Sequence, residues 1–266
     1  MLKSNNLYLG DCLDLLAKIE DQTIDLVFLD PPYNLQLNKV LTRPNHSIVN
    51  GVNQDWDKFD SYSSYDDFTF SYLTECKRVL KPDGGLWIIG SYHNIFRIGK
   101  ILQDLNFWIL NDVIWAKSNP LPNFRATRLT NAHETLIWCS KKPKSKYQFN
   151  YHTLKVANED RQERSIWNFP ICSGKERLKN NKKQTAHPTQ KPLALMKKII
   201  IQSSIQGDLV LEPFAGTASF CAEAKYLGRN YIGFEKDETY FNLAIKRLKK
   251  IKSLKNDLLE INEKDK

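Results

Sequence analysis

The sequence has no apolar run of the roughly 18 residues that a membrane-spanning helix requires. Its first residues also lack the apolar core of a signal peptide. We therefore expect a cytoplasmic protein with no membrane partner. The five cysteines are odd in number, widely spaced and without a metal-ligand pattern. They predict reduced, mostly buried thiols and no metal site.

The composition is otherwise that of an ordinary soluble protein. Hydrophobic residues make up 41% and charged residues 26% of 266 residues, enough for one large α/β domain or two small ones. The formal net charge is +9. This balance favours a polyanionic partner without proving one.

The tetrapeptide Asp30-Pro31-Pro32-Tyr33 follows an apolar run over residues 24–29 that is typical of a buried parallel strand. In open α/β sheets, ligands bind beyond the carboxyl ends of the strands. Two prolines fix two φ angles and remove two backbone donors, so a stiff elbow should present a carboxylate, carbonyls and an aromatic ring. A planar amine could donate to Asp30 while its ring stacks on Tyr33. On these residues alone, a purely structural turn is the alternative.

Strands alternate with helices along most of the chain, which predicts βαβ units and a mostly parallel sheet. Residues 81–85 are expected to form a turn, and 149–184 show little regular pattern. The predicted strands are 6–10, 24–29, 86–90, 107–115, 135–139, 208–211 and 230–234, and the predicted helices are 12–19, 65–80, 95–105, 193–203, 220–227 and 239–252.

The C-terminal third contains a strand, a small-residue turn over 212–219, a helix and a second strand that ends at Glu235. Small residues let the backbone approach a ligand, and the helix N-terminus adds positive potential. An acid about 20 residues beyond such a turn commonly binds ribose hydroxyls. This unit predicts an adenosine-containing cofactor. Asp11, after the first strand, is either a helix N-cap or a second carboxylate beside that cofactor.

Three segments interrupt the alternation, at 34–60, 117–134 and 149–186. The first contains Trp56, which either anchors the loop or contacts a ligand. The second mixes proline, arginine and asparagine, which suits contacts to phosphates and base edges. The third interleaves basic residues with Trp167, as in single-strand and backbone contacts to nucleic acid. A Pro-rich surface connection and a solvated charged face are the alternatives for the second and third.

Taken together, the chain resembles the DNA amino-methyltransferases that use S-adenosylmethionine, in the β-class order with D-P-P-Y before F-x-G-x-G. It is most similar to the cell-cycle-regulated adenine methyltransferases and their restriction-system relatives that modify GANTC. Two positions depart from the family pattern: Glu212 replaces the usual Asp, and Ala218 replaces the second glycine. The strings that carry the closer similarity are IGSYHNI at 89–95, FWILND at 107–112, NPLPNF at 119–124, NAHE at 131–134 and HPTQKP at 187–192.

The resemblance implies an α/β, Rossmann-like S-adenosylmethionine-dependent methyltransferase fold, circularly permuted. A single domain would span 1–252 with the three insertions contacting DNA, and a charged tail would follow at 253–266. The implied reaction methylates the exocyclic N6 amine of adenine in a short specific DNA sequence, GANTC being the candidate, after base flipping. The implied partners are double-stranded DNA, a cognate restriction endonuclease and a second copy in a homodimer.

The resemblance also implies roles for individual residues. The catalytic residues would be Asp30, Pro31, Pro32 and Tyr33. S-adenosyl-L-methionine would contact Asp11, Cys12, Asp30, Thr189, Gln190, Lys191, Glu212, Phe214, Gly216, Thr217, Ala218 and Glu235. DNA would contact Trp56, Asn123, Arg125, Arg128, Lys175 and Arg177.

Three other functions are alternatives to this one. The same chemistry could act on cytosine in DNA or on a base in RNA, but cytosine enzymes more often carry Ser before P-P-Y, so Asp30 favours adenine. A non-enzymatic DNA-binding protein on a decayed scaffold would have no reason to keep residues 30–33 intact. A nicotinamide-dependent dehydrogenase is disfavoured because the turn lacks G-x-G-x-x-G.

Overall fold

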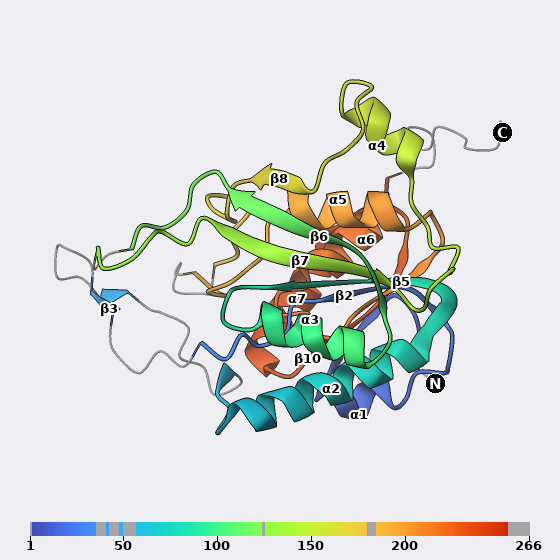
Figure 1. The fold of residues 1–266 in the computed structure, drawn as a ribbon, viewed down its shortest axis with the longest axis horizontal. Helices are drawn as coiled ribbons and strands as arrows, with labels where there is room; N and C mark the ends of the chain where they lie inside the picture. The colour runs from blue at the N-terminus through green and yellow to red at the C-terminus, as the bar shows by residue number, and fades with distance from the viewer. Residues whose placement is uncertain are drawn as a thin grey trace.

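The computed structural model describes residues 2–35, 41–42, 48–49, 57–123, 126–179 and 185–254. Its centre is an eight-stranded sheet in the order β1-β10-β9-β2-β5-β7-β6-β8 (Figure 1). A separate pair, β3 (Leu41–Thr42) and β4 (Ile48–Val49), is antiparallel. The strands of the main sheet are β1 (Asn6–Leu9), β2 (Ile24–Leu29), β5 (Leu80–Gly90), β6 (Trp108–Lys117), β7 (His133–Ser140), β8 (Ile166–Phe169), β9 (Leu209–Glu212) and β10 (Asn230–Glu235).

Helices cover both faces of this sheet. They are α1 (Cys12–Leu16), α2 (Tyr62–Val79), α3 (Ile95–Asp104), α4 (Tyr151–Ala157), α5 (Leu193–Ser203), α6 (Ser219–Tyr226) and α7 (Glu238–Lys250). The first three pack on one face, and α5, α6 and α7 pack on the other. None of these described helices is long and apolar enough to cross a membrane.

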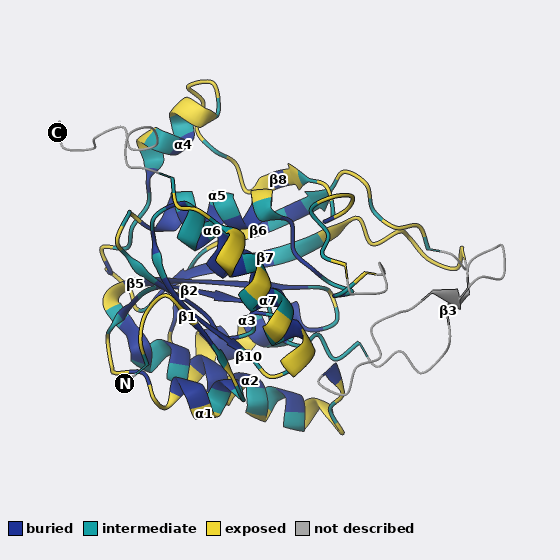
Figure 2. Cartoon of the chain, turned by 180° about the vertical axis from the view of Figure 1, so that it is seen from behind, coloured by how far each residue is buried: buried dark blue, intermediate teal, exposed yellow. Residues whose placement is uncertain are grey.

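The central strand β2 explains why both faces are covered. Leu26 and Phe28 pack towards α5 and α6, whereas Val27 and Leu29 pack towards α1 and α2. Every residue of β2 except Asp25 is apolar, so the strand has two faces to bury, as in parallel sheets. Figure 2 shows the central part of the sheet around β2 mostly buried, while α4 and the loops beside β8 remain partly exposed.

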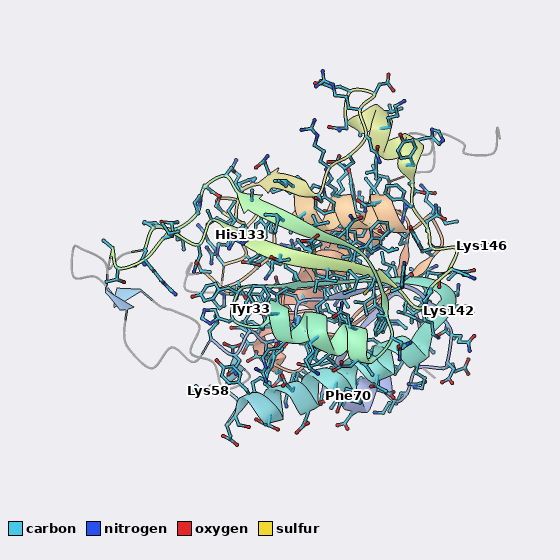
Figure 3. All side chains as sticks on the ribbon, in the orientation of Figure 1. Tyr33, Lys58, Phe70, His133, Lys142 and Lys146 are labelled. Carbon is cyan, nitrogen blue, oxygen red and sulfur yellow. The ribbon has the colours of Figure 1, made fainter. Side chains whose placement is uncertain are left out.

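The sheet is mostly parallel, as predicted: five of its seven strand pairings run parallel. The exception is β7, which is antiparallel to both β5 and β6. It therefore begins at the edge where β2 and β5 end. In Figure 3, His133 at the start of β7 lies near Tyr33, whereas Lys142 and Lys146 beyond its end lie on the opposite side.

Two expectations from the sequence were wrong. The predicted turn at 81–85 is the beginning of β5, because parallel pairing with β2 supplies backbone partners at both ends of it, at Leu80 and Gly85. The segment 149–184 contains α4 and β8, and β8 pairs with β6. Trp167 on β8 is buried in the core and is therefore not a surface aromatic. The four residues of β8 are too few to show a pattern before their partner strand is known.

Candidate active site

The elbow and the cofactor unit, which are far apart in sequence, line one cavity of about 410 Å³. Asp30 to Tyr33 follow directly after β2, β9 pairs in parallel with β2, and β10 pairs in parallel with β9. Their carboxyl ends therefore meet at one edge, which brings Gly216 and Glu235 to the same cavity. Asp11 and Phe214 also line it. This juxtaposition is the one that the sequence predicted.

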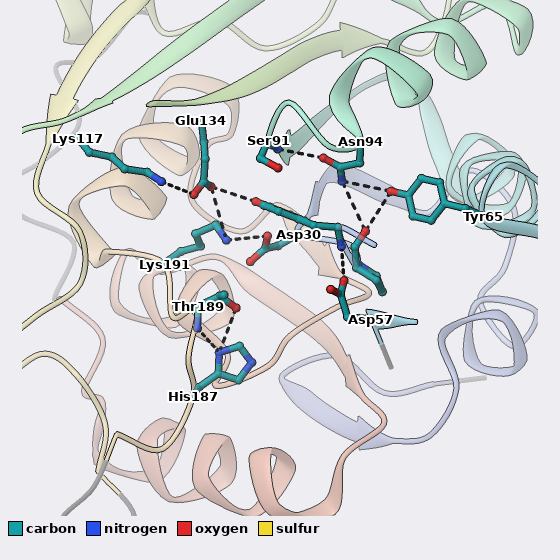
Figure 4. Close-up of polar contacts among 12 residues, drawn as sticks. Asp30, Asp57, Tyr65, Ser91, Asn94, Lys117, Glu134, His187, Thr189 and Lys191 are labelled. Atoms are coloured by element: carbon teal, nitrogen blue, oxygen red, sulfur yellow. Dashed lines mark hydrogen bonds and ion pairs between the residues drawn. The ribbon is translucent and has the colours of Figure 1, made fainter. Parts of the chain in front are cut away.

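The elbow is held by side chains that the sequence did not single out. The buried carboxylate of Asp57 accepts hydrogen bonds from the backbone N–H groups of Tyr33 (2.6 Å), Asn34 (2.8 Å) and Leu35 (2.9 Å). Burial raises the pKa of Asp57, which these backbone donors partly offset. On the other side, the hydroxyl of Tyr65 donates to the Pro32 carbonyl at 3.0 Å (Figure 4).

Two elbow side chains, Asp30 and Tyr33, meet three further charged side chains. Figure 4 labels these three as Lys191, Glu134 and Lys117. The ammonium of Lys191 lies 2.8 Å from the Asp30 carboxylate and 3.8 Å from Glu134. Glu134 also accepts a hydrogen bond from Lys117 at 2.7 Å and one from the Tyr33 hydroxyl at 3.0 Å. The Lys191 ammonium lies 5.1 Å from the centre of the Tyr33 ring. Two positive and two negative groups thus balance inside a nearly closed region.

Burial and ion pairing act in opposite directions on these groups. Burial raises the pKa of Asp30, although its ion pair with Lys191 opposes the rise. For Glu134, burial also raises the pKa, but Lys191 and Lys117 together bring it below its ordinary value. For Lys191, burial lowers the pKa, and the two carboxylates more than compensate.

At the other end of the cavity, Glu235 closes β10. Its carboxylate accepts from the backbone N–H of Gly216 at 2.6 Å and of Asp237 at 2.7 Å. Burial raises the pKa of Glu235 to about 7. Asp11 is the N-cap of α1 and accepts from Leu13 N–H at 3.0 Å, so that expectation is confirmed. Its position on the cavity wall leaves its second predicted role open.

The turn between β9 and α6 holds two residues in the left-handed region, Gly216 (φ +52°) and Ala218 (φ +54°). Glu212, the residue that departs from the family's Asp, accepts from the backbone N–H of Phe220 (3.2 Å) and Cys221 (2.9 Å). It therefore satisfies the N-terminus of α6. Burial raises the pKa of Glu212 to about 7.

We expect Gly216→Ala to destabilise the protein by about 1–2 kcal/mol, the cost of a left-handed conformation for an L-residue. The added Cβ would also lie 3.2 Å from the His187 ring. Ala218→Gly is the matched control two residues away: relief of the same strain offsets the lost burial of one methyl group, about 0.8 kcal/mol. Urea denaturation of both variants measures the difference, and equal losses would contradict this account of the turn.

The segment before α5 was predicted to hold the cofactor's methionine end, and its side chains are already engaged. Gln190 accepts from Leu178 N–H and donates to the Glu176 carbonyl, both at 3.0 Å. Thr189 lines the cavity beside His187. The sequence assigned no role to His187, whose ring packs edge-on against Tyr240 at 4.5 Å. Burial lowers the pKa of His187 to about 4, so the ring is neutral at physiological pH.

The remaining predicted cofactor residues line the same cavity, except Ala218, which is fully buried and does not reach the cavity wall. Cys12, Phe214 and Thr217 contribute to its wall. Phe214 packs edge-on against Tyr72 at 5.1 Å, which fixes the ring from the side of α2. Burial raises the pKa of the Cys12 thiol to about 12, so it is a neutral, apolar contact. The other four cysteines are buried and free as well, as expected.

The predicted DNA-contacting residues are dispersed. Trp56 and Arg125, and most of the insertion at 34–60, lie outside the described residues. The Arg128 guanidinium lies 5.5 Å from the Tyr92 ring centre, and Asn123 donates to the Arg128 carbonyl at 3.2 Å. Lys175 is exposed, whereas Arg177 donates to the Pro188 carbonyl at 2.8 Å.

These residues suit an adenosine derivative. A carboxylate ends β10, a left-handed glycine and two further small residues form the turn, and the N-terminus of α6 faces the same cavity. The cavity lies within the roughly 300–1,000 Å³ of small-molecule sites. Glu235, Gly216 and Asp11 are the residues that would hold such a group.

Comparison with known proteins decides the family. The family model N6_N4_Mtase, described as DNA methylase, matches residues 24–246. The chain belongs to this N6/N4 DNA methylase family. It is 51% identical over 254 residues to the Type II methyltransferase M.HinfI of Haemophilus influenzae, covering 96% of this chain and 71% of that protein. It is 40% identical over 257 residues to the Type II methyltransferase M2.MboI of Moraxella bovis, covering 96% and 92%.

Solved structures agree with the family. The M1.HpyAVI–SAM complex has a TM-score of 0.65 at 28% identity, covering 91% of this chain and 98% of that one. The cytosine-N4-specific PvuII DNA methyltransferase has a TM-score of 0.70 at 19% identity, covering 93% and 87%, and shares the fold. The predicted fold class is confirmed. The N6/N4 DNA methylase is an enzyme that methylates DNA, and its cofactor is S-adenosyl-L-methionine.

Proposed function

We propose that this N6/N4 DNA methylase transfers a methyl group to the exocyclic N6 amine of adenine in double-stranded DNA. The observation that carries the proposal is the Asp30 carboxylate, which follows β2 and faces the cavity that also contains Glu235. The Pro32 carbonyl is engaged by Tyr65, so Pro31 provides the next carbonyl of the elbow. Together, Asp30 and the Pro31 carbonyl can accept both N–H groups of one amine.

The residues of the elbow would orient the amine and need not activate it chemically. S-Adenosyl-L-methionine, when bound, supplies an electrophilic methyl group. Two acceptors that take both N–H groups favour a pyramidal nitrogen whose lone pair faces that methyl. Good orientation can contribute within the ~7–11 kcal/mol available from proximity. Asp30 would act as hydrogen-bond acceptor and then as proton acceptor.

Tyr33 would receive the target base. Removing a base from the duplex costs a few kcal/mol, of which stacking on an aromatic ring recovers ~1–3 kcal/mol. The ring of Tyr33 suits this role because both of its ends are fixed: its backbone N–H by Asp57, and its hydroxyl by Glu134.

For the cofactor, we propose that Glu235 binds the ribose hydroxyls and Asp11 the adenine, with Phe214 and Gly216 along the cavity wall. Thr189 would contact the methionine end. For DNA, we propose contacts by Asn123, Arg128, Lys175 and Arg177 and by the insertions of a single domain over 1–252. Among these, Arg128 packs on the ring of Tyr92, which lies in the segment that follows β5.

The finer target proposed is GANTC, on the strength of the strings at 89–95, 119–124 and 187–192. A cognate restriction endonuclease fits the names of the two Type II relatives. A homodimer remains a further prediction, to be tested by the mass of the protein in solution.

Nucleoside analysis tests the proposal directly. We expect DNA from a methylase-free host that expresses this chain to yield N6-methyladenine on digestion and mass spectrometry. Sequencing of the same DNA is expected to place the modified base in GANTC. N4-methylcytosine in place of N6-methyladenine would overturn the adenine assignment, and N6-methyladenine at other sequences would overturn only the target. DNA from cells that express Asp30→Ala provides the background.

A further inference from the structure

The cluster behind the elbow contains more charge than amine binding requires. Asp30 alone would serve as acceptor, yet Lys191, Glu134 and Lys117 extend from it in a continuous series of contacts at 2.8, 3.8 and 2.7 Å. The exposed fractions of these three side chains are only 7%, 13% and 14%. Withdrawing three charged groups from water is costly unless they are paired and hydrogen-bonded.

Glu134 contacts both Tyr33 of the elbow and the Lys191 side chain that pairs with Asp30. One of its oxygens accepts from Lys117, and the other accepts from the Tyr33 hydroxyl and faces Lys191. The ring of Tyr33 is thereby fixed at its outer end. The ammonium of Lys191 lies between the two carboxylates, Asp30 and Glu134, and over the same ring. A change at Glu134 therefore reaches both the acid and the ring of the elbow.

We propose that Glu134 and Lys191 are positioning residues for amine methylation, which hold the Asp30 carboxylate and the Tyr33 ring in the arrangement that receives the target base. This inference rests on the proposed function of Asp30. Lys191 orients one oxygen of Asp30 and supplies its counter-charge. Glu134 shares the positive charge of Lys191. The ion pair between Lys191 and Asp30 is thereby weakened, and Asp30 stays able to accept a hydrogen bond from the substrate amine. Lys117 neutralises Glu134 from β6.

A positioning role of this kind predicts opposite electrostatic effects of the two residues. The Lys191 cation favours the ionised form of Asp30, whereas the Glu134 anion disfavours it. The other groups around Asp30 are Tyr33 from the elbow and Lys117 behind Glu134. The cavity that Asp30 faces is also lined by the titratable side chains of Asp11, Asp57, His187, Glu212, Glu235 and Lys236. Glu235 is proposed to act in cofactor binding. Measuring the rate at saturating cofactor therefore keeps the titration of Glu235 from affecting the methyl-transfer rate.

The experiment measures single-turnover methyl transfer to DNA between pH 5 and pH 10 at saturating cofactor. We expect Lys191→Gln to move the acidic limb of the rate profile upward by about one pH unit or more, the effect of losing an opposite charge at this distance. Glu134→Gln, which still accepts from Tyr33, is expected to move the limb downward. Lys191→Arg is expected to return it towards that of the unmodified enzyme. Lys198→Gln is the matched control, because Lys198 forms a similar ion pair with Glu163 at 2.8 Å.

Equal rate losses at every pH, with no movement of the limb in either variant, would overturn the inference in favour of a merely structural cluster. Unchanged rates would overturn it as well. If Lys191→Gln does not fold, Glu134→Gln still tests the predicted direction in which the acidic limb moves. The DNA from each reaction is also digested to nucleosides to identify the modified base. If the two variants shift the acidic limb in opposite directions but the product is N4-methylcytosine, the adenine assignment is wrong and the positioning role stands.

Discussion

Asp30→Ala is expected to lower the rate of methyl transfer by at least about 10²- to 10⁴-fold, the usual contribution of a positioned proton acceptor. The substitution removes one of two acceptors for the amine and leaves Lys191 with Glu134 as its remaining partner. Cofactor binding should stay within a small factor of that of the unmodified enzyme, since Glu235 and the turn at Gly216 are untouched. Single-turnover transfer of a labelled methyl group, with calorimetry for the cofactor, measures both.

Asp25→Ala is the control for a lost carboxylate on the same strand. Asp25 forms an ion pair with Lys81 at 2.6 Å and accepts from Leu209 N–H at 2.9 Å, near the amino end of β2 and away from the cavity. This variant is expected to lose stability and to keep its transfer rate. If Asp30→Ala transferred methyl groups as fast as Asp25→Ala, the role assigned to the elbow would be wrong.

Glu235→Gln is expected to weaken cofactor binding by about 10- to 150-fold, which corresponds to the ~1.5–3 kcal/mol of a hydrogen bond to a charged group. Gln can still accept from Gly216 N–H, so the turn should keep its shape. DNA affinity should change little. Glu238→Gln, on the exposed first turn of α7, provides the control for charge.

The same carboxylate predicts a pH dependence of cofactor binding. Because burial raises the pKa of Glu235 to about 7, its ionised form is lost as the pH falls through that value. Ribose hydroxyls donate more strongly to the ionised form, so affinity should fall by up to about tenfold from pH 8 to pH 6. 5′-Methylthioadenosine is the suitable probe, since it carries the ribose and adenine without the amino-acid group. A pH dependence that persists in Glu235→Gln would point to another residue.

Much of this site could be predicted because its signals are local. The elbow at 30–33 and the acid at Glu235 each follow an apolar strand, and parallel strands bring their carboxyl ends to one edge. The N-cap role of Asp11 also depends only on its neighbours. For such residues, the local sequence pattern together with the parallel direction of the strand predicts where the side chain lies.

Glu134 and Asp57 could not be found in this way. Glu134 stands near the start of a strand, and in a parallel strand that position would lie at the edge far from the site. It reaches the site because β7 is antiparallel, and the apolar pattern of residues 135–139 is the same in either direction. Asp57 acts across 24 positions of sequence on the backbone of Tyr33, with no periodic signal. The direction of a strand and a contact at such separation are decided by the whole fold.

The hairpin of β6 and β7 has a consequence for how this enzyme can change. Lys117 ends β6 and Glu134 lies at the start of β7, so their ion pair joins the two ends of the connection between the strands. The ion pair therefore holds the strand residues on either side of that connection together. The ion pair also supports the elbow, because Glu134 accepts from the Tyr33 hydroxyl as well. We therefore expect changes in what this connection contacts to leave the methyl-transfer chemistry at the elbow intact.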